Sequence, residues 1–381
     1  MTMPNVPAVQ EEYFEDQPTG IEHEVEEERP PSHPSVHADI RVTTKQFSLR
    51  HLMDLIEDRG LELAPDFQRN QVWRPSQKSK LIESILLQFP LPAFYFAETA
   101  DGDLRVVDGM QRLSTIHSFM RLSGFSLSGV EYLDEVEGAT FDELALPWRR
   151  RMDNTQIFAH VIDPKTPAWV TYNIFKRINT GGTPLKPQEI RHCMSTQRSR
   201  DFLKSCTALP EFDQATGFRL RNSPRMDDRE VVLRFCAFRL LGVEGYQERA
   251  QGSIESFLME VTNQLDDPKR VDDATLDRLR EEFRSAMVNA AIVFGDHAFR
   301  KWPEWSDYRS PINKALFESW AVALADLTST EAEDRAEAIV ARARHLMSHD
   351  TRYLDSISVG TGDSRKVAHR FTTARDVVKQ A

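Results

Sequence analysis

The chain has 381 residues, of which 40% are hydrophobic and 28% are charged, as in a globular protein of two or three domains. It contains no apolar run of the about 20 residues that a transmembrane helix needs, and residues 1–10 lack the pattern of a signal peptide. We therefore expect a cytoplasmic protein with no membrane partner. The three cysteines are too few and too widely spaced for a disulfide framework or a zinc motif, so we expect them to be reduced.

The formal net charge of −11 weighs at first against a nucleic-acid partner, because phosphate binding depends on clustered basic residues. Residues 1–39, however, hold ten acidic residues and one arginine, so −9 of the charge lies there and the remaining 342 residues carry −2. This segment has six prolines and no regular hydrophobic period, which predicts a disordered acidic leader. A solvated tail is the favoured interpretation, and a partner-docking or DNA-mimicking arm is the alternative. Deleting residues 1–39 is expected to leave folding intact.

Regular structure is expected from about residue 40. Residues 48–60 begin with a serine, carry apolar side chains on one face and end at a glycine, which predicts a short helix. A strand at 61–64 then leads through a polar and aromatic connection to a second helix at 76–89, which Pro90 ends.

A β-hairpin is predicted next, because residues 93–97 and 104–107 have strand composition and flank an Asp-Gly turn. Directly after the second strand, residues 108–120 change from a strand pattern to a helical period, and Gly109 stands at the change. Residues 123–154 are expected to form loops and short strands, as an insertion.

The remaining chain is predicted to be mainly helical. A strand at 156–162 and a helix at 167–178 precede a glycine-rich loop and a further helix near Pro187. Amphipathic stretches then recur at 226–242, 251–266, 273–294, 312–328 and 330–347. The fold class expected is α+β, with a first domain over residues 40–200 and a mostly α-helical domain over residues 201–381.

The strand–Asp-Gly-Met-Gln-Arg–helix element is the motif with the clearest chemistry. A helix that begins after a glycine turn presents unpaired N–H groups and its positive dipole end to an anion. Arg112 adds a permanently charged fork for phosphate oxygens, Gln111 can donate to a phosphate or orient a water, and Asp108 can hold a metal ion or accept a proton. The alternative is structural: Asp108 caps the helix, and Arg112 pairs with an internal acid.

Two further segments contain candidate ligand-binding residues. Arg69 and Trp73 lie in an irregular segment, where an arginine and an aromatic ring can surround a base or sugar, or can equally form a cation–π corner of the core. The sequence from Asn179 through Thr180, Gly181 and Gly182 ends a helix and permits close backbone approach to a ligand, although a glycine C-cap explains it as well.

Four motifs together resemble those of the DUF262 family, which contains prokaryotic proteins related to the N-terminal half of GmrSD-type modification-dependent restriction enzymes. The first motif is Phe67-Gln68-Arg69 with Trp73, and the second is Lys80-Leu-Ile-Glu-Ser-Ile-Leu before Pro90-Leu-Pro. The third is Val107-Asp-Gly-Met-Gln-Arg-Leu-Ser-Thr, and the fourth is Ile178-Asn-Thr-Gly-Gly-Thr-Pro-Leu with Glu189-Ile-Arg191. Their order and spacing over about residues 45–195 make the resemblance specific.

The resemblance implies a ParB/sulfiredoxin-like fold for the N-terminal domain and hydrolysis of nucleoside triphosphates in defence against foreign DNA. The family's Asp-Gly-Gln-Gln-Arg motif falls on residues 108–112, where Met110 replaces the usual first glutamine. It implies that Asp108, Gln111 and Arg112 are catalytic and that Asp108 helps to hold Mg²⁺. The implied phosphate- and nucleotide-binding residues are Gly109, Gln68, Arg69, Trp73, Asn179, Thr180, Gly181 and Gly182.

Several other chemistries lack their motifs. Restriction members of the family commonly carry an HNH nuclease domain, and no His-Asn-His constellation is present here. His345 and His349 stand four residues apart on an expected helix, but no cysteine or third ligand is evident, so two surface histidines are the favoured interpretation. The segment from Gly360 to Lys366 lacks the spacing of a P-loop. A nucleotide site is therefore expected in the N-terminal domain.

The sequence thus predicts a Mg²⁺-dependent NTPase of a restriction or antiviral defence system. The alternative is a non-enzymatic module that senses DNA or a partner protein and recruits a separate nuclease or defence subunit. A ParB-like DNA nuclease is a third, less favoured hypothesis. The helical half can serve as a homodimer interface or as a platform for a partner, and its amphipathic pattern does not decide between these roles.

Overall fold

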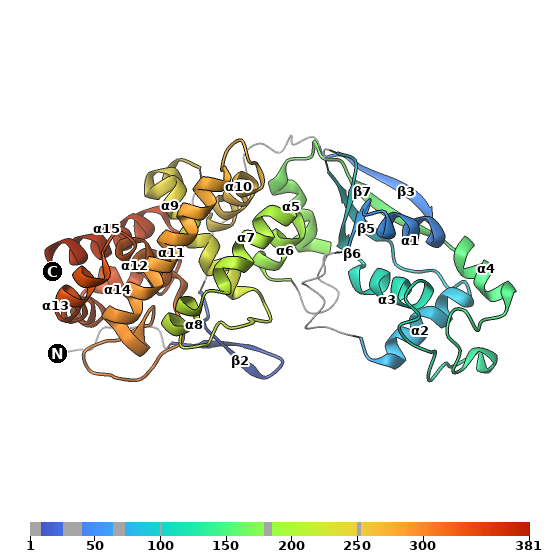
Figure 1. Ribbon diagram of the computed structural model, residues 1–381, viewed down its shortest axis with the longest axis horizontal. Helices are drawn as coiled ribbons and strands as arrows, with labels where there is room; N and C mark the ends of the chain where they lie inside the picture. Colours follow the sequence, from blue (N-terminus) through green and yellow to red (C-terminus); the bar gives the residue numbers. More distant parts are fainter. Residues whose placement is uncertain (1–8, 26–39, 64–72, 100, 179–184, 250–252) are drawn as a thin grey trace. The chain divides into compact units, whose positions relative to one another are not determined.

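The structure is a computed structural model that describes residues 9–25, 40–63, 73–99, 101–178, 185–249 and 253–381. The described residues fall into two compact units (Figure 1). The unit between residues 35 and 194 contains a five-stranded sheet and is called the sheet unit. The unit that combines residues before 35 with residues 195–381 is called the helical unit.

The sheet mixes parallel and antiparallel pairs. Its strands lie in the order β3 (Val42–Ser48), β7 (Gln156–Ile162), β5 (Phe94–Glu98), β6 (Leu104–Asp108) and β4 (Leu61–Glu62). Strands β5 and β6 are antiparallel, which confirms the predicted hairpin, whereas β7 is parallel to β5 and β4 is parallel to β6. Strand β3, which the sequence did not predict, pairs antiparallel with β7 along all seven of its residues.

In the described part of this unit, six α-helices accompany the sheet: α1 (Leu49–Glu57), α2 (Pro75–Leu86), α3 (Met110–Met120), α4 (Leu146–Asn154), α5 (Ala168–Ile178) and α6 (Pro187–Met194). Side chains from α1 to α4 share one buried core with alternate residues of the strands, such as Val106. Because neighbouring strand residues point to opposite faces, Arg105 points away from this core, and its Nη1 donates to the carbonyl oxygen of Met194 at the end of α6. Helices therefore cover both faces of the sheet (Figure 1).

The insertion at 123–154 differs from its prediction. It contains a 3₁₀ turn at Asp134–Val136 and helix α4, and no strand in this described stretch. The buried carboxylate of Glu83 accepts hydrogen bonds from the backbone N–H groups of Glu131, Tyr132 and Leu133 at 2.7–3.0 Å. The Glu83 carboxylate thus supplies the hydrogen-bond acceptors that these backbone N–H groups would otherwise need from a neighbouring strand.

The helical unit surrounds a second core that shares no residue with the first. Its helices are α7 (Gln197–Thr207), α8 (Pro210–Thr216), α9 (Asp227–Arg249), α10 (Ile254–Asp266), α11 (Asp273–Phe294), α12 (Lys314–Leu324), α13 (Ser329–His349), α14 (Thr351–Ser356) and α15 (Ser364–Gln380). The five predicted amphipathic stretches correspond to α9 to α13. The predicted class, an α+β region followed by a mostly helical one, is confirmed; the likeness to the ParB/sulfiredoxin fold stays a prediction.

The expectation of a disordered leader is wrong for its described part. Strands β1 (Glu11–Phe14) and β2 (Gln17–Glu22) pair antiparallel, and Ile21 is fully buried in the core of the helical unit. Glu22 accepts hydrogen bonds from Nζ of Lys301 at 2.6 Å and from Nδ2 of Asn313 at 3.0 Å. These partners of Glu22 lie 279 and 291 residues away in the sequence, so the local composition of residues 1–39 gives no sign of them.

Among the helices of the described residues, none is both long enough and apolar enough to cross a membrane. The three cysteines are buried as free thiols, in agreement with the expected reduced state.

Candidate functional site

The junction between β6 and α3 holds four of the predicted site residues. Asp108 ends β6, and Gly109 is the N-cap of α3 in the left-handed region, with φ 97° and ψ 10°. A Cβ atom on Gly109 would lie 2.3 Å from Cδ1 of Phe94, so both the backbone conformation and the neighbouring ring require glycine. Gly109 has no side chain with which to cap the first turn of α3, where N–H groups lack intrahelical acceptors.

Arg112 connects this junction to the start of β5. Its guanidinium lies over the Phe94 ring, with Cζ 4.1 Å from the ring centroid. Its Nη2 donates to Oδ2 of Asp108 at 2.9 Å and to the carbonyl oxygen of Ala93 at 3.1 Å, and its Nη1 donates to the carbonyl oxygen of Pro92. The arginine therefore holds the first turn of α3, the end of β6 and the chain entering β5 together, and its pairing with an acid is the part of the structural alternative that the contacts include.

The ion pair remains accessible on its acidic side. The Asp108 side chain is 34% exposed and that of Arg112 is 13% exposed. Burial lowers the pKa of Arg112, and the Asp108 carboxylate opposes this shift. Because the pKa of a guanidinium is so high, Arg112 stays charged at neutral pH. A fixed cation beside a helix N-terminus suits an anionic ligand, which would share Arg112 with Asp108 or replace it as the partner.

The structure describes only part of the predicted ligand-binding set. Gln111 lies half-buried in the first turn of α3, next to Arg112 in sequence. Trp73 is partly buried and packs at the margin of the core of the sheet unit. The other six predicted ligand-binding residues lie outside the described residues, so their closing of a pocket stays a prediction: Gln68, Arg69, Asn179, Thr180, Gly181 and Gly182.

Helix α6 contains the last residues of the fourth motif. Oε2 of Glu189 accepts a hydrogen bond from the backbone N–H of Lys186 at 2.6 Å, which caps the beginning of its own helix. Arg191 is fully buried, and its Nε donates to Oε1 of Gln188 at 2.8 Å. Both side chains therefore have structural contacts in or at the beginning of α6.

Apart from Asp108, the groups that hold Arg112 in place are not among the predicted site residues. Phe94 supplies the ring beneath the guanidinium, and Pro92 and Ala93 supply carbonyl oxygens. The hairpin register pairs Tyr95 with Asp108, so a register prediction would have brought Phe94 close to the motif. Backbone carbonyl acceptors are present at every position and leave no signal in the sequence.

Asp108 can serve as a Mg²⁺ ligand only if a bound nucleotide supplies further ligands. Within the described ranges, one group of three His, Cys, Asp or Glu side chains has ligand atoms close enough to share an ion; it consists of Glu304, His345 and His349 and excludes Asp108. Asp108 thus offers a single carboxylate. Mg²⁺ is commonly bound by one or two carboxylates together with phosphate oxygens, so Asp108 fits that ion only as one ligand beside a phosphate.

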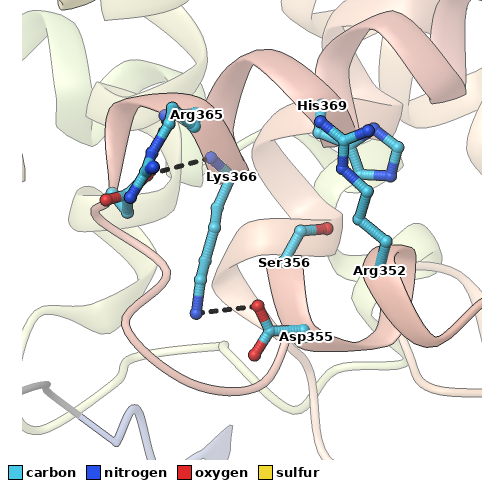
Figure 2. Close-up of a pocket in the computed structure, with 7 residues that line it drawn as sticks. Arg352, Asp355, Ser356, Arg365, Lys366 and His369 are labelled. Carbon is cyan, nitrogen blue, oxygen red and sulfur yellow. Dashed lines mark hydrogen bonds and ion pairs between the residues drawn. The ribbon is translucent and has the colours of Figure 1, made fainter.

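A separate pocket of about 250 Å³ lies in the helical unit between α14 and the start of α15 (Figure 2). Its lining residues are Arg352, Asp355, Ser356, Asp363, Arg365, Lys366 and His369. Asp363 caps α15 by accepting hydrogen bonds from the backbone N–H groups of Arg365 and Lys366, and Nζ of Lys366 pairs with Asp355 at 2.9 Å. Burial lowers the pKa of His369. These internal contacts neutralise much of the positive charge that an anionic ligand would need.

The sheet unit is thus a mixed sheet with a strand–glycine–helix junction, at which Arg112 pairs with Asp108 beside the first turn of α3. Residues 52–195 match the family model for the N-terminal domain of the GmrSD restriction endonuclease. The match confirms the resemblance over this part of the chain, which corresponds closely to the sheet unit. The comparison with curated proteins gives no match.

Proposed function

We propose that the chain is a nucleotide-binding component of a restriction or defence system and hydrolyses nucleoside triphosphates with Mg²⁺ in the cytoplasm. The observation that carries this proposal is the β6–α3 junction, where a glycine N-cap, a fixed guanidinium and a partly exposed carboxylate lie together. The match to the GmrSD N-terminal domain over residues 52–195 supports the defence context. DNA and a separate nuclease or defence subunit are the partners proposed for this role.

Each residue has a stated role in this proposal. The first-turn amides of α3 and the guanidinium of Arg112 bind phosphate oxygens, because both are fixed before the ligand arrives. Gln111 orients the attacking water, and Asp108 binds the ion beside a phosphate. When bound, Mg²⁺ supplies neutralisation of phosphate charge. The residues proposed to close the pocket are Gln68, Arg69, Trp73 and Asn179 to Gly182.

Phosphate release from ATP and GTP, measured with Mg²⁺ on the full-length chain, tests the proposal. Truncating the Arg112 side chain to alanine would also deprive the carbonyl oxygens of Pro92 and Ala93 of their hydrogen-bond donor, so Arg112→Lys is preferred. Lysine keeps the charge but loses the planar fork. Both Arg112→Lys and Asp108→Asn are expected to lower kcat/KM by about 100-fold or more.

Arg121→Ala is the matched control. Arg121 lies at the opposite end of α3 and also pairs with carboxylates, its Nη2 with Asp54 at 2.7 Å and its Nε with Glu57 at 3.2 Å. This variant should hydrolyse nucleotide at the wild-type rate. Wild-type rates in folded Arg112→Lys and Asp108→Asn proteins would refute the site, with circular dichroism establishing that each variant is folded.

One observation favours a second function. The guanidinium of Arg112 donates to Asp108 and to two backbone carbonyl oxygens, so it has structural partners without any substrate. In this case the chain is a non-enzymatic module that binds DNA or a partner and recruits a separate nuclease. DNA binding that weakens steeply with salt, without phosphate release from any nucleotide, would favour it over the NTPase.

A further inference from the structure

The C-terminal end of helix α13 places two histidines opposite a glutamate from a distant loop. His345 and His349 are four residues apart, so their side chains lie on the same face of the helix, with ring centroids 4.6 Å apart. Glu304 faces both rings: its Oε1 lies 3.4 Å from Nδ1 of His345, and its Oε2 lies 2.8 Å from Nε2 of His349. One ligand atom from each of the three side chains lies within 4.8 Å of the others.

The loop that carries Glu304 is fixed against α13 by contacts other than those of its carboxylate. The backbone N–H of Glu304 donates to Oγ of Ser348 at 2.7 Å, and Nη2 of Arg344 donates to the carbonyl oxygens of Pro303 and Glu304 at 3.2 and 3.1 Å. Arg344 and Ser348 immediately precede His345 and His349 on the helix. The backbone positions of all three side chains are therefore set before any ligand binds.

The electrostatic setting favours a cation. The site lies at the C-terminal end of a helix of 21 residues, where the carbonyl groups and the negative dipole end are located. Glu304 directs its two carboxyl oxygens at the two imidazole rings. Arg344 is the nearby positive charge, and Asp307 pairs with it at 3.1 Å.

We propose that Glu304, His345 and His349 form a binding site for a divalent first-row transition metal ion, with Zn²⁺ as its representative. Two imidazoles and one carboxylate are ligands that Zn²⁺ accepts, and three protein ligands leave a fourth position for water or an incoming group. This site lies in the helical unit and is independent of the phosphate chemistry proposed at the β6–α3 junction.

The geometry requires little rearrangement. Two ligand atoms bound to one Zn²⁺ at about 2.1 Å in tetrahedral geometry lie about 3.4 Å apart. The three ligand atoms, which lie within 4.8 Å of one another, must therefore approach by about 1.4 Å or less. All three side chains are between 46% and 65% exposed, so side-chain rotation supplies the movement without repacking the core.

Isothermal titration of the untagged full-length chain with ZnCl₂ at neutral pH tests the site. Saturable binding of one ion per chain is expected, and Co²⁺ should give the absorption spectrum of a tetrahedral complex. His349→Ala and Glu304→Gln should each weaken Zn²⁺ binding at least about tenfold, because each removes a direct ligand. Both side chains are exposed, so these substitutions leave the core unchanged, and circular dichroism checks that each variant is folded.

His23→Ala is the matched control, since His23 is 57% exposed and also lies beside a glutamate, with Nδ1 3.9 Å from Oε1 of Glu12. This variant should bind Zn²⁺ like the wild type. The proposal is overturned if the wild type shows no saturable binding, if either ligand variant retains wild-type affinity, or if His23→Ala loses binding to the same extent.

Discussion

Charged side chains are buried in the helical unit where opposite charges surround them. Arg234 contacts Glu24, Glu230 and Glu318, and Lys314 contacts Asp227 and Glu230. Burial alone would lower the pKa of Lys314, but the neighbouring carboxylates raise it well above its usual value. These groups stay charged because several partners together replace the water that was lost.

Asp228 differs from these groups, and it predicts a pH-dependent stability. Burial raises the pKa of its carboxyl to about 7 in the folded chain, from an ordinary value of 3.8. Between these values the folded chain binds a proton that the unfolded chain does not, so stability falls as pH rises from about 4 to about 7. Asp228→Asn should remove this loss and raise the free energy of unfolding at pH 8 by a few kcal/mol (~1.4 kcal/mol for each pH unit of pKa difference).

Urea unfolding at about pH 5 and about pH 8 measures the effect, which should be smaller at the lower pH. Asp227→Asn is the control, because it removes a buried partner of Lys314, 3.1 Å from its Nζ, and should destabilise the chain at both pH values. A constant difference between Asp228→Asn and the wild type across this range would contradict the assignment.

At the scale of elements, the β1–β2 hairpin and the residues after it are part of the helical unit. Glu24 bonds to partners that lie 210 and 337 residues away in the sequence. The backbone N–H of Glu22 donates to the carbonyl oxygen of Ile312, and the N–H of Gly360 donates to that of Val25. Glu24 accepts from Nη2 of Arg234 at 2.8 Å. This segment is therefore part of the fold, and its acidic residues neutralise buried bases.

Glu22→Ala is expected to destabilise the helical unit by about 3–5 kcal/mol, because it leaves the buried ammonium of Lys301 without its carboxylate partner. Adding Lys301→Met should recover part of the loss, since the uncompensated charge is then removed. Asp326→Ala is the control: it breaks an exposed pair with Arg239 and should change stability by about 1 kcal/mol or less. Equal effects of Glu22→Ala and Asp326→Ala in urea unfolding would refute the structural role of the hairpin.

At the scale of the whole molecule, the chain forms one continuous unit and one discontinuous unit. The sheet unit lies entirely within residues 35–194, whereas the helical unit needs chain from both sides of it. The two cores have no residue in common. A continuous segment with its own core can fold alone.

Residues 35–194 expressed alone should therefore unfold cooperatively in urea. Residues 195–381 expressed alone should be less stable than the same segment linked to residues 9–25, because Lys301 and Arg234 lose partners and Ile21 leaves the core. Adding the 9–25 peptide in trans should raise the midpoint of unfolding. A non-cooperative transition of the 35–194 fragment, or identical stability with and without residues 9–25, would contradict this division.

The sequence by itself determined the features that depend on local spacing. The helices at α1, α2 and α3, the β5–β6 hairpin and the glycine at residue 109 follow from periodicity, capping and turn chemistry within a few residues. The motif at 108–112 is likewise a local pattern of five consecutive residues. These signals act between near neighbours, so they are already present in the unfolded chain.

Only the tertiary structure decided which distant groups meet. It placed Arg112 on Phe94 and on two backbone carbonyls, brought Glu304 to His345 and His349, and buried Glu22 against Lys301. Strand β3 likewise depends on its partner β7, more than 100 residues away. A carboxylate in the sequence gives no sign of whether water, a base or a metal ion will surround it, because burial and pairing arise only when the chain has packed.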